Sequence, residues 1–233
     1  MHKKKIAVIT GGSSGIGKAI CETLVQKEYA VINADIHSPE VALSGDFISC
    51  DVTEAKDIDH LYDYVISNFG VPDVLISNAG QGIHEKITEG DPQKWAKVID
   101  INLMGALRFV RAFIPNMMEQ KRGTIVFVSS TAAKQVYTYG GIYSASKAAL
   151  NMVAKTLQLE VEGALKIGLV SPGVVDTKFF KNMISGFHTV EDIGWGSLSP
   201  RQIADIIFYI IDLPPSVNLS EIIITPANQP FSG

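Results

Sequence analysis

Short runs of consecutive apolar residues alternate along this chain with longer segments of helical periodicity. Consecutive apolar residues predict strands that are buried on both faces, because a strand with one wet face would alternate polar and apolar residues. Strands are predicted at residues 6–10, 30–34, 47–50, 74–77, 125–129, 167–171 and 222–225. Helices are predicted at residues 16–27, 54–69, 92–119, 143–162 and 200–213. The alternation predicts an α/β fold, a doubly wound Rossmann-type parallel sheet with helices on both faces.

The length of 233 residues suits a single domain spanning residues 1–233, with no internal repeat or low-complexity linker. The segment 176–199 interrupts the regular alternation and is rich in Gly, Phe, Met and Trp. Long loops in compact domains are usually functional, so we expect a lid over a site, with a plain long loop as the alternative.

Composition argues against several classes of protein. The net charge of −4 gives no basic stripe for nucleic acid. No apolar run approaches the roughly 20 residues that span a bilayer, so no membrane partner is expected. Polar residues at 10–14 interrupt the first apolar stretch, which does not read as a signal peptide, and we expect a cytoplasmic protein. Cys21 and Cys50 have neither a disulfide framework nor metal-ligand spacing, so no metal is expected.

A glycine-rich turn follows the first predicted strand and opens the first helix, with the sequence Thr10-Gly11-Gly12-Ser13-Ser14-Gly15-Ile16-Gly17. Glycines allow a tight turn and a close approach of backbone to a pyrophosphate. The helix start offers free N–H groups and partial positive charge to the phosphates. The spacing is G-x-x-x-G-x-G instead of the common G-x-G-x-x-G, and a purely structural turn is the alternative. The strand–turn–helix context favours a dinucleotide site.

Asp35 stands at the end of the second predicted strand. A carboxylate there can accept hydrogen bonds from both adenosine ribose hydroxyls and would repel a 2′-phosphate. No Arg or Lys occupies Ser13, Ser14, Ile36 or His37, where such a phosphate would need a partner. The pattern favours NAD(H) over NADP(H), the alternative being that Asp35 only caps a loop.

The remaining motifs, taken in order, resemble those of the short-chain dehydrogenase/reductase family over nearly the whole chain. They are the glycine turn, Asp51-Val52, Asn78-Ala79-Gly80, Asn102, Ser129-Ser130, Tyr143-Ser144-Ala145-Ser146-Lys147 and Pro172-Gly173 with Thr177. The resemblance implies a catalytic set of Asn102, Ser130, Tyr143 and Lys147, with Ser129 as the alternative serine. It also implies cofactor contacts from Gly11, Ser13, Ser14, Gly15, Ile16, Gly17, Asp35, Ile36, Asp51, Val52, Asn78, Ala79, Gly80, Tyr143, Lys147, Pro172, Gly173, Val175 and Thr177.

Two features depart from the family pattern. The family often ends in a V-D-G-G stretch, whereas this chain has Thr225-Pro226-Ala227-Asn228-Gln229-Pro230, which puts subunit packing and part of the substrate floor in doubt. Only about a dozen residues separate Asp35 from Phe47, too few for a full crossover helix, so we expect a loop or short turn there.

The chemistry of the catalytic set follows from its residue types. A free tyrosine, with a pKa of about 10, is a poor base near neutrality. Lys147 lies one helical turn from Tyr143 on the same face, and its ammonium is expected to lower that pKa. Lys147 would also donate to the nicotinamide ribose, and Ser130 would hold the substrate oxygen. The resemblance implies that Asn102 holds a water between Lys147 and solvent.

The predicted reaction interconverts a small or medium secondary alcohol and its ketone with NAD(H). Substrate contacts are expected from a mainly aromatic set with few polar atoms: His84, Gln135, Tyr137, Phe179, Phe180, Met183 and Trp195. The resemblance implies a homodimer or homotetramer, paired through helices 92–119 and 143–162.

Two other functions compete with this one. A non-catalytic NAD-binding regulatory or scaffold protein would not need the full Asn-Ser-Tyr-Lys set. Sugar epimerases and dehydratases usually carry G-x-x-G-x-x-G and a longer C-terminal domain, and this chain has neither.

Overall fold

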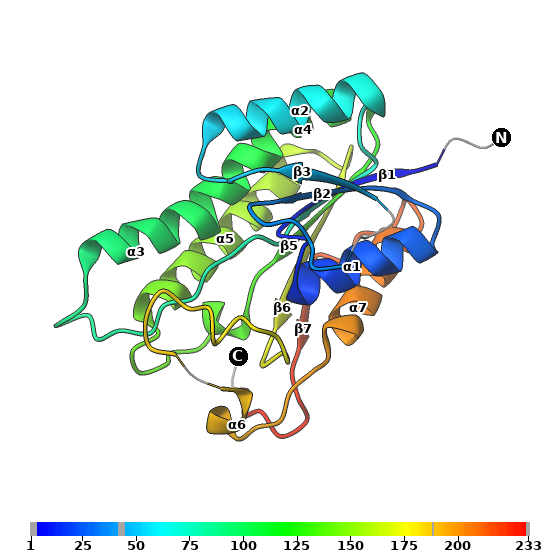
Figure 1. The fold of residues 1–233 in the computed structure, drawn as a ribbon. Helices are drawn as coiled ribbons and strands as arrows, with labels where there is room; N and C mark the ends of the chain where they lie inside the picture. Colours follow the sequence, from blue (N-terminus) through cyan, green and yellow to red (C-terminus); the bar gives the residue numbers. More distant parts are fainter. Residues whose placement is uncertain (1–3, 42–44, 188, 232–233) are drawn as a thin grey trace.

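The computed structural model describes residues 4–41, 45–187 and 189–231, which form a seven-stranded parallel sheet of order β3-β2-β1-β4-β5-β6-β7 (Figure 1). The strands are β1 (Ile6–Thr10), β2 (Ala30–Asp35), β3 (Asp46–Ser49), β4 (Val74–Ser77), β5 (Thr124–Val128), β6 (Lys166–Pro172) and β7 (Glu221–Ile224). The helices are α1 (Gly15–Gln26), α2 (Ala55–Asn68), α3 (Pro92–Ile99), α4 (Ala106–Gln120), α5 (Gly141–Glu160), α6 (Val190–Ile193) and α7 (Pro200–Asp212). The predicted doubly wound α/β fold is confirmed.

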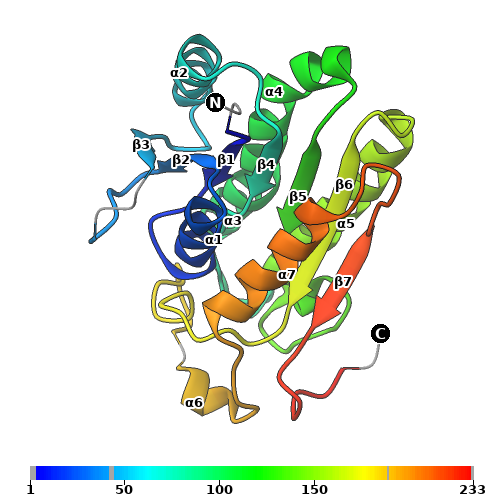
Figure 2. The ribbon, with the colours of Figure 1, turned by 90° about the vertical axis from the view of Figure 1, so that its right-hand side faces the viewer.

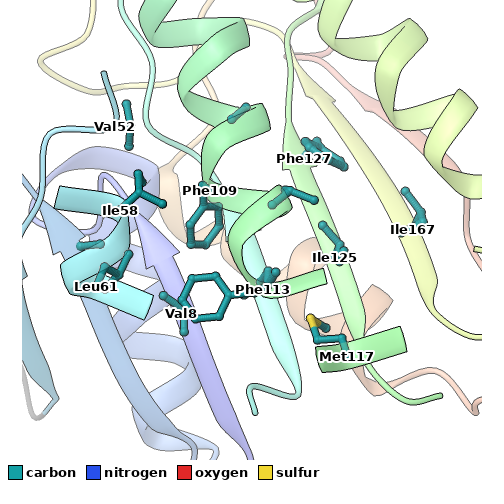
Figure 3. Close-up of a cluster of buried hydrophobic side chains, with 14 of the residues drawn as sticks. Val8, Val52, Ile58, Leu61, Phe109, Phe113, Met117, Ile125, Phe127 and Ile167 are labelled. Carbon is teal, nitrogen blue, oxygen red and sulfur yellow. The ribbon is translucent and has the colours of Figure 1, made fainter. Parts of the chain in front are cut away.

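Helices cover both faces of the sheet. Helices α1 and α7 lie together on one face, in front of the sheet in Figure 2, and α2, α4 and α5 cover the other. Figure 3 shows the cluster on the second face, where Phe109 and Phe113 of α4 pack between side chains of α2 and the strands. Both phenylalanines are fully buried. The burial of each side chain contributes roughly 2–3 kcal/mol to the stability of the fold.

The strand order reverses between β1 and β4. The strands that follow β1 in the chain, β2 and β3, lie on one side of it, and those that follow β4 lie on the other. The loops after β1 and β4 therefore lead to opposite sides at the carboxyl edge of the sheet. In open parallel sheets the crevice at such a switch point is the usual ligand site. The glycine turn follows β1 and the Asn78-Ala79-Gly80 segment follows β4, so both predicted cofactor segments meet there.

The helix predicted over residues 92–119 is divided in the structure. Between α3 and α4 lies a π-helical segment, η1 (Asp100–Gly105), whose wider turns contain Asn102. Such single-turn π segments inside α-helices often occur at functional sites. Hydrophobic periodicity did not predict it, because the inserted turn shifts the pattern only slightly.

Other differences are smaller. Cys50 and Thr225, predicted as strand ends, lie just outside β3 and β7. Between β2 and β3 the described residues, 36–41 and 45, contain no helix, as the short spacing predicted. Two short elements were not predicted: the 3₁₀ turn η2 (Thr131–Ala133) after β5, and α6 within the segment 176–199.

Candidate active site

A cavity of about 1330 Å³ lies along the carboxyl ends of the strands. Its wall begins at Gly11 after β1 and includes residues from the ends of β2, β4, β5 and β6, as well as Gln229 from the C-terminal segment. Residues distant in sequence therefore share one cavity, large enough for an extended ligand together with a small second molecule.

The glycine turn forms one end of this cavity. Gly11 has a φ of +68°, and a Cβ on it would lie 2.9 Å from Cα of Ala79, so this position requires glycine. The side-chain amide of Asn78 donates to the carbonyl oxygens of Thr10 and Gly11, each at 3.0 Å, and fixes the turn against β4.

The start of α1 has the features of an anion site. Ser14 is the N-cap residue, yet its side chain makes no capping hydrogen bond and the first turn has no acidic residue. The first N–H groups of the helix are thus left to a ligand, next to Gly15 and Ile16 on the cavity wall. These residues fit the pyrophosphate of a dinucleotide.

Asp35 ends β2 and lies on the cavity wall. Its carboxylate accepts the backbone N–H of Ser13 at 3.0 Å and that of His37 at 3.1 Å. Each oxygen has a further lone pair, so the group can still accept ribose hydroxyls while these bonds hold its orientation.

Tyr143 and Lys147 lie one turn apart near the start of α5. The ammonium nitrogen Nζ of Lys147 is buried and donates to the carbonyl oxygen of Val128 at 3.0 Å. It lies 6.0 Å from the ring centroid of Tyr143. Burial lowers the pKa of Lys147 to about 8, because a charged amine loses hydration inside the protein.

The pKa of the Tyr143 phenol differs from the sequence-based expectation. Burial raises it to about 12, while a hydrogen bond with Ser130 acts in the lowering direction. The lowering by Lys147 that the sequence predicted does not appear in the protein alone, where loss of hydration of the phenolate is the largest effect on this pKa.

The structure distinguishes the two candidate serines. Both serines belong to the cavity lining, but Ser130 hydrogen-bonds with Tyr143. Ser129 is buried, and its hydroxyl donates to Oδ1 of Asn151 at 2.5 Å. The geometry favours Ser130 over Ser129 as the serine that faces a substrate.

Asn102 lies behind the wall instead of on it. It is 1% exposed, and its Oδ1 accepts the backbone N–H of Gln81 at 2.7 Å. Its Nδ2 donates to the carbonyl oxygen of Gln81 and to Oγ of Ser146, each at 3.0 Å. The side chain of Asn102 thus joins the π-helical segment to the loop after β4 and to α5.

Aromatic side chains surround the phenol at the other end of the cavity. The ring of Phe179 lies 5.7 Å from that of Tyr143, and Phe180 lies 5.6 Å from Phe179, measured between centroids. The backbone N–H of Ile184 donates to the carbonyl oxygen of Gly82 at 2.9 Å, so the segment 176–199 is joined to the loop after β4.

The wall contains most of the residues predicted for the site. Among predicted cofactor contacts, Ser13 and Gly17 are not on it, because Ser13 lies behind the turn against His37 and Gly17 packs against Gly11. Among predicted substrate contacts, His84, Tyr137, Phe179, Phe180, Met183 and Trp195 line it. Gln135 does not: its side chain is held by Pro230 and the Tyr137 hydroxyl. Sequence reasoning missed Asn182 and Gln229, which belong to no motif.

Comparison with known proteins identifies the family. The sequence profile of the short chain dehydrogenase family matches residues 5–186. The chain belongs to this family. An uncharacterized oxidoreductase of Staphylococcus epidermidis is 30% identical over 232 residues, which cover 96% of this short-chain dehydrogenase and 98% of that protein.

Solved structures with this fold include two dehydrogenases that are 26% identical to this short-chain dehydrogenase. An alcohol dehydrogenase from the archaeon Thermococcus sibiricus, complexed with 5-hydroxy-NADP, superposes with a TM-score of 0.86 over 99% of this chain and 100% of its own. A ligand-free aldohexose dehydrogenase of Thermoplasma acidophilum gives a TM-score of 0.88 over 99% and 97%. No helix among the described residues is long and apolar enough to cross a membrane.

Proposed function

We propose that this short-chain dehydrogenase interconverts a small or medium secondary alcohol and its ketone with NAD(H), using Tyr143 as general acid and base. The observation that carries the proposal is the shared cavity: the phenol of Tyr143, with Ser130 and Lys147, faces the same space as the glycine turn. The aromatic wall formed by Phe179, Phe180 and other side chains suits an uncharged substrate.

The chain's own residues handle the proton. A nicotinamide bound in the cavity would accept or supply hydride. In oxidation, the phenolate oxygen of Tyr143 takes the hydroxyl proton, and in reduction the phenol returns it to the carbonyl oxygen. Ser130 hydrogen-bonds with the phenol and holds the substrate oxygen against it. Lys147 adds positive charge below the ring and favours the phenolate, and it has further N–H groups for a ribose hydroxyl. Asn102 is proposed to order a water between Lys147 and solvent.

The pKa of about 12 for Tyr143 adds one requirement to this mechanism. A phenol this weakly acidic supplies little base near neutral pH, so in the direction of oxidation it needs further positive charge beside it. An oxidised dinucleotide bound in the cavity would supply such charge and would favour the phenolate form of Tyr143.

We propose NAD(H) as the cofactor because the Asp35 carboxylate lies on the cavity wall, where it could accept hydrogen bonds from the adenosine ribose hydroxyls. The Thermococcus alcohol dehydrogenase is complexed with an NADP derivative, so the shared fold by itself does not exclude NADP(H). A cytoplasmic location and a homodimer or homotetramer stay predictions from the sequence.

The second candidate is a regulatory or scaffold protein that binds NAD without turnover. A screen of alcohols with NAD and ketones with NADH, followed by absorbance of the reduced nicotinamide, separates the two functions. Turnover with one member of the panel supports the enzyme. Tight NAD binding without turnover on a broad panel would favour the regulatory protein.

A further inference from the structure

The C-terminal segment 225–231 returns from β7 to the cavity and places one polar side chain in its wall. Gln229 is only 7% exposed and belongs to the cavity lining. Its backbone N–H donates to the carbonyl oxygen of Pro226 at 3.0 Å, closing a turn that directs the side chain inward. This is the stretch in which the chain departs from the family's V-D-G-G ending.

The carboxamide of Gln229 touches two segments. Its Oε1 accepts the backbone N–H of Val174 at 2.9 Å. Its Nε2 donates to the hydroxyl oxygen of Thr131 at 3.4 Å, a long and weak bond. It also packs on Gly173 so closely that a Cβ on Gly173 would collide with the amide oxygen.

In the proposed reaction, one of these two segments contacts the cofactor and the other adjoins the residue that holds the substrate oxygen. Val174 follows Pro172-Gly173, which with Thr177 match the family motif that holds the nicotinamide amide, and which we propose to do so here. Thr131 follows Ser130, which is proposed to hold the substrate oxygen. The far side of the loop is fixed by the N–H of Leu198, which donates to the carbonyl oxygen of Val174 at 2.9 Å. Gln229 accepts the backbone N–H of the same residue, so both backbone groups of Val174 are held.

We propose that Gln229 is a positioning residue, which fixes the cofactor ring relative to the substrate oxygen by joining Val174 to Thr131. The inference rests on the proposed function. Hydride transfer depends steeply on the distance between the reacting atoms, and a misplacement of about 1 Å can slow a reaction about a hundredfold. Dinucleotide affinity comes mainly from the glycine turn and Asp35, at the other end of the cavity, so loss of this contact should affect kcat more than binding.

Three substitutions test the contact. Gln229→Met keeps the volume and removes both hydrogen bonds, and Gln229→Asn keeps the amide but is too short to reach Val174. Gln229→Glu keeps an acceptor for the Val174 N–H, and its second oxygen can accept the Thr131 hydroxyl. Asn228→Ala is the matched control, because Asn228 is exposed on the same segment.

We expect Gln229→Met and Gln229→Asn to lower kcat at least tenfold, with the Kd for NADH within threefold of the wild-type value. The fluorescence of bound NADH should weaken in both, because the ring is less ordered. Asn228→Ala should stay within threefold in kcat, and Gln229→Glu, which keeps both contacts, should lose less of kcat than Gln229→Met. If one of the two disruptive variants does not fold, the other carries the test.

Two results would overturn the proposal: wild-type kcat and NADH fluorescence in the disruptive variants, or a parallel loss of Tm, Kd and kcat in all three Gln229 variants. The second would make Gln229 merely structural. A wild-type protein that binds NADH but has no turnover would refute the proposed function instead. The fluorescence comparison then still decides the role of Gln229.

Discussion

Replacing Asn102 with alanine tests whether the π-helical segment is held by that side chain. The amide makes three hydrogen bonds, two partly buried ones with the Gln81 backbone and one buried one with Ser146. At about 1 kcal/mol net for each bond, Asn102→Ala should lower the free energy of unfolding by about 3 kcal/mol. For a chain of this length the Tm should fall by about 6–12 °C. Asn68→Ala is the control, because Asn68 is exposed and donates only to the carbonyl oxygen of Tyr64, so its loss should cost less than about 1 kcal/mol.

Thermal unfolding followed by circular dichroism, with kcat measured on the same samples below the transition, separates two roles for Asn102. A structural role lowers Tm and displaces Gln81, which lies beside the proposed cofactor segment, so activity falls as well. A loss of activity with a Tm change below 3 °C, within the range of the Asn68→Ala control, would refute the structural reasoning and leave only the proposed water-ordering role.

The remaining predictions concern the proton, the cofactor and pH. Tyr143→Phe should lower kcat by about 10²–10⁴-fold with unchanged Kd for NAD, because only the proton-transferring oxygen is removed; unchanged turnover would end the proposed mechanism. The wild-type protein should prefer NADH to NADPH at least tenfold in kcat/KM, roughly 1.4 kcal/mol, and Asp35→Asn should reduce that ratio; equal values in the wild type would refute the role of Asp35. Burial lowers the pKa of Lys147 from 10.5 to about 8, so between these values this side chain binds more protons in the unfolded chain than in the native one. The contribution of Lys147 to stability should therefore rise with pH across this window, by at most about 3 kcal/mol. Burial raises the pKa of Cys21 and of Cys50 to about 12, and these thiols act in the opposite direction above about pH 9. The test is therefore a difference: urea titrations should give stability a more positive pH slope in the wild type than in Lys147→Met, and identical slopes would contradict this cause.

Regular spacing explains why most of the fold was predictable. Strands buried on both faces produce continuous apolar runs, so β1 and β4 were placed with their observed bounds. The π-helical segment was not predictable, since one wider turn changes side-chain directions without changing residue type. A motif therefore indicated the presence of Asn102, but nothing in the sequence indicated its hydrogen bonds with Gln81 and Ser146.

The candidate site was predictable only where side-chain chemistry is tied to short motifs. The turn at Gly11 and the Tyr143–Lys147 pair have fixed local spacing, and both lie on the cavity wall. Gln135 was misplaced because closeness in sequence to Tyr137 does not fix direction, and Tyr137 itself holds the Gln135 side chain. Gln229 was missed because its partner Val174 is distant in sequence, and no local pattern marks such a contact.

The cavity wall takes residues from segments throughout the described chain, from Gly11 to Gln229. A dinucleotide bound there would act as a non-covalent crosslink between segments that follow different strands of the sheet. At a concentration a hundredfold above its Kd it would add about 2.7 kcal/mol to the free energy of unfolding. The lifetime of the protein under proteolysis should then follow the supply of its cofactor, with the cofactor-poor protein degraded first. A rate of limited proteolysis that does not change with added NAD would show that the segments do not depend on the ligand.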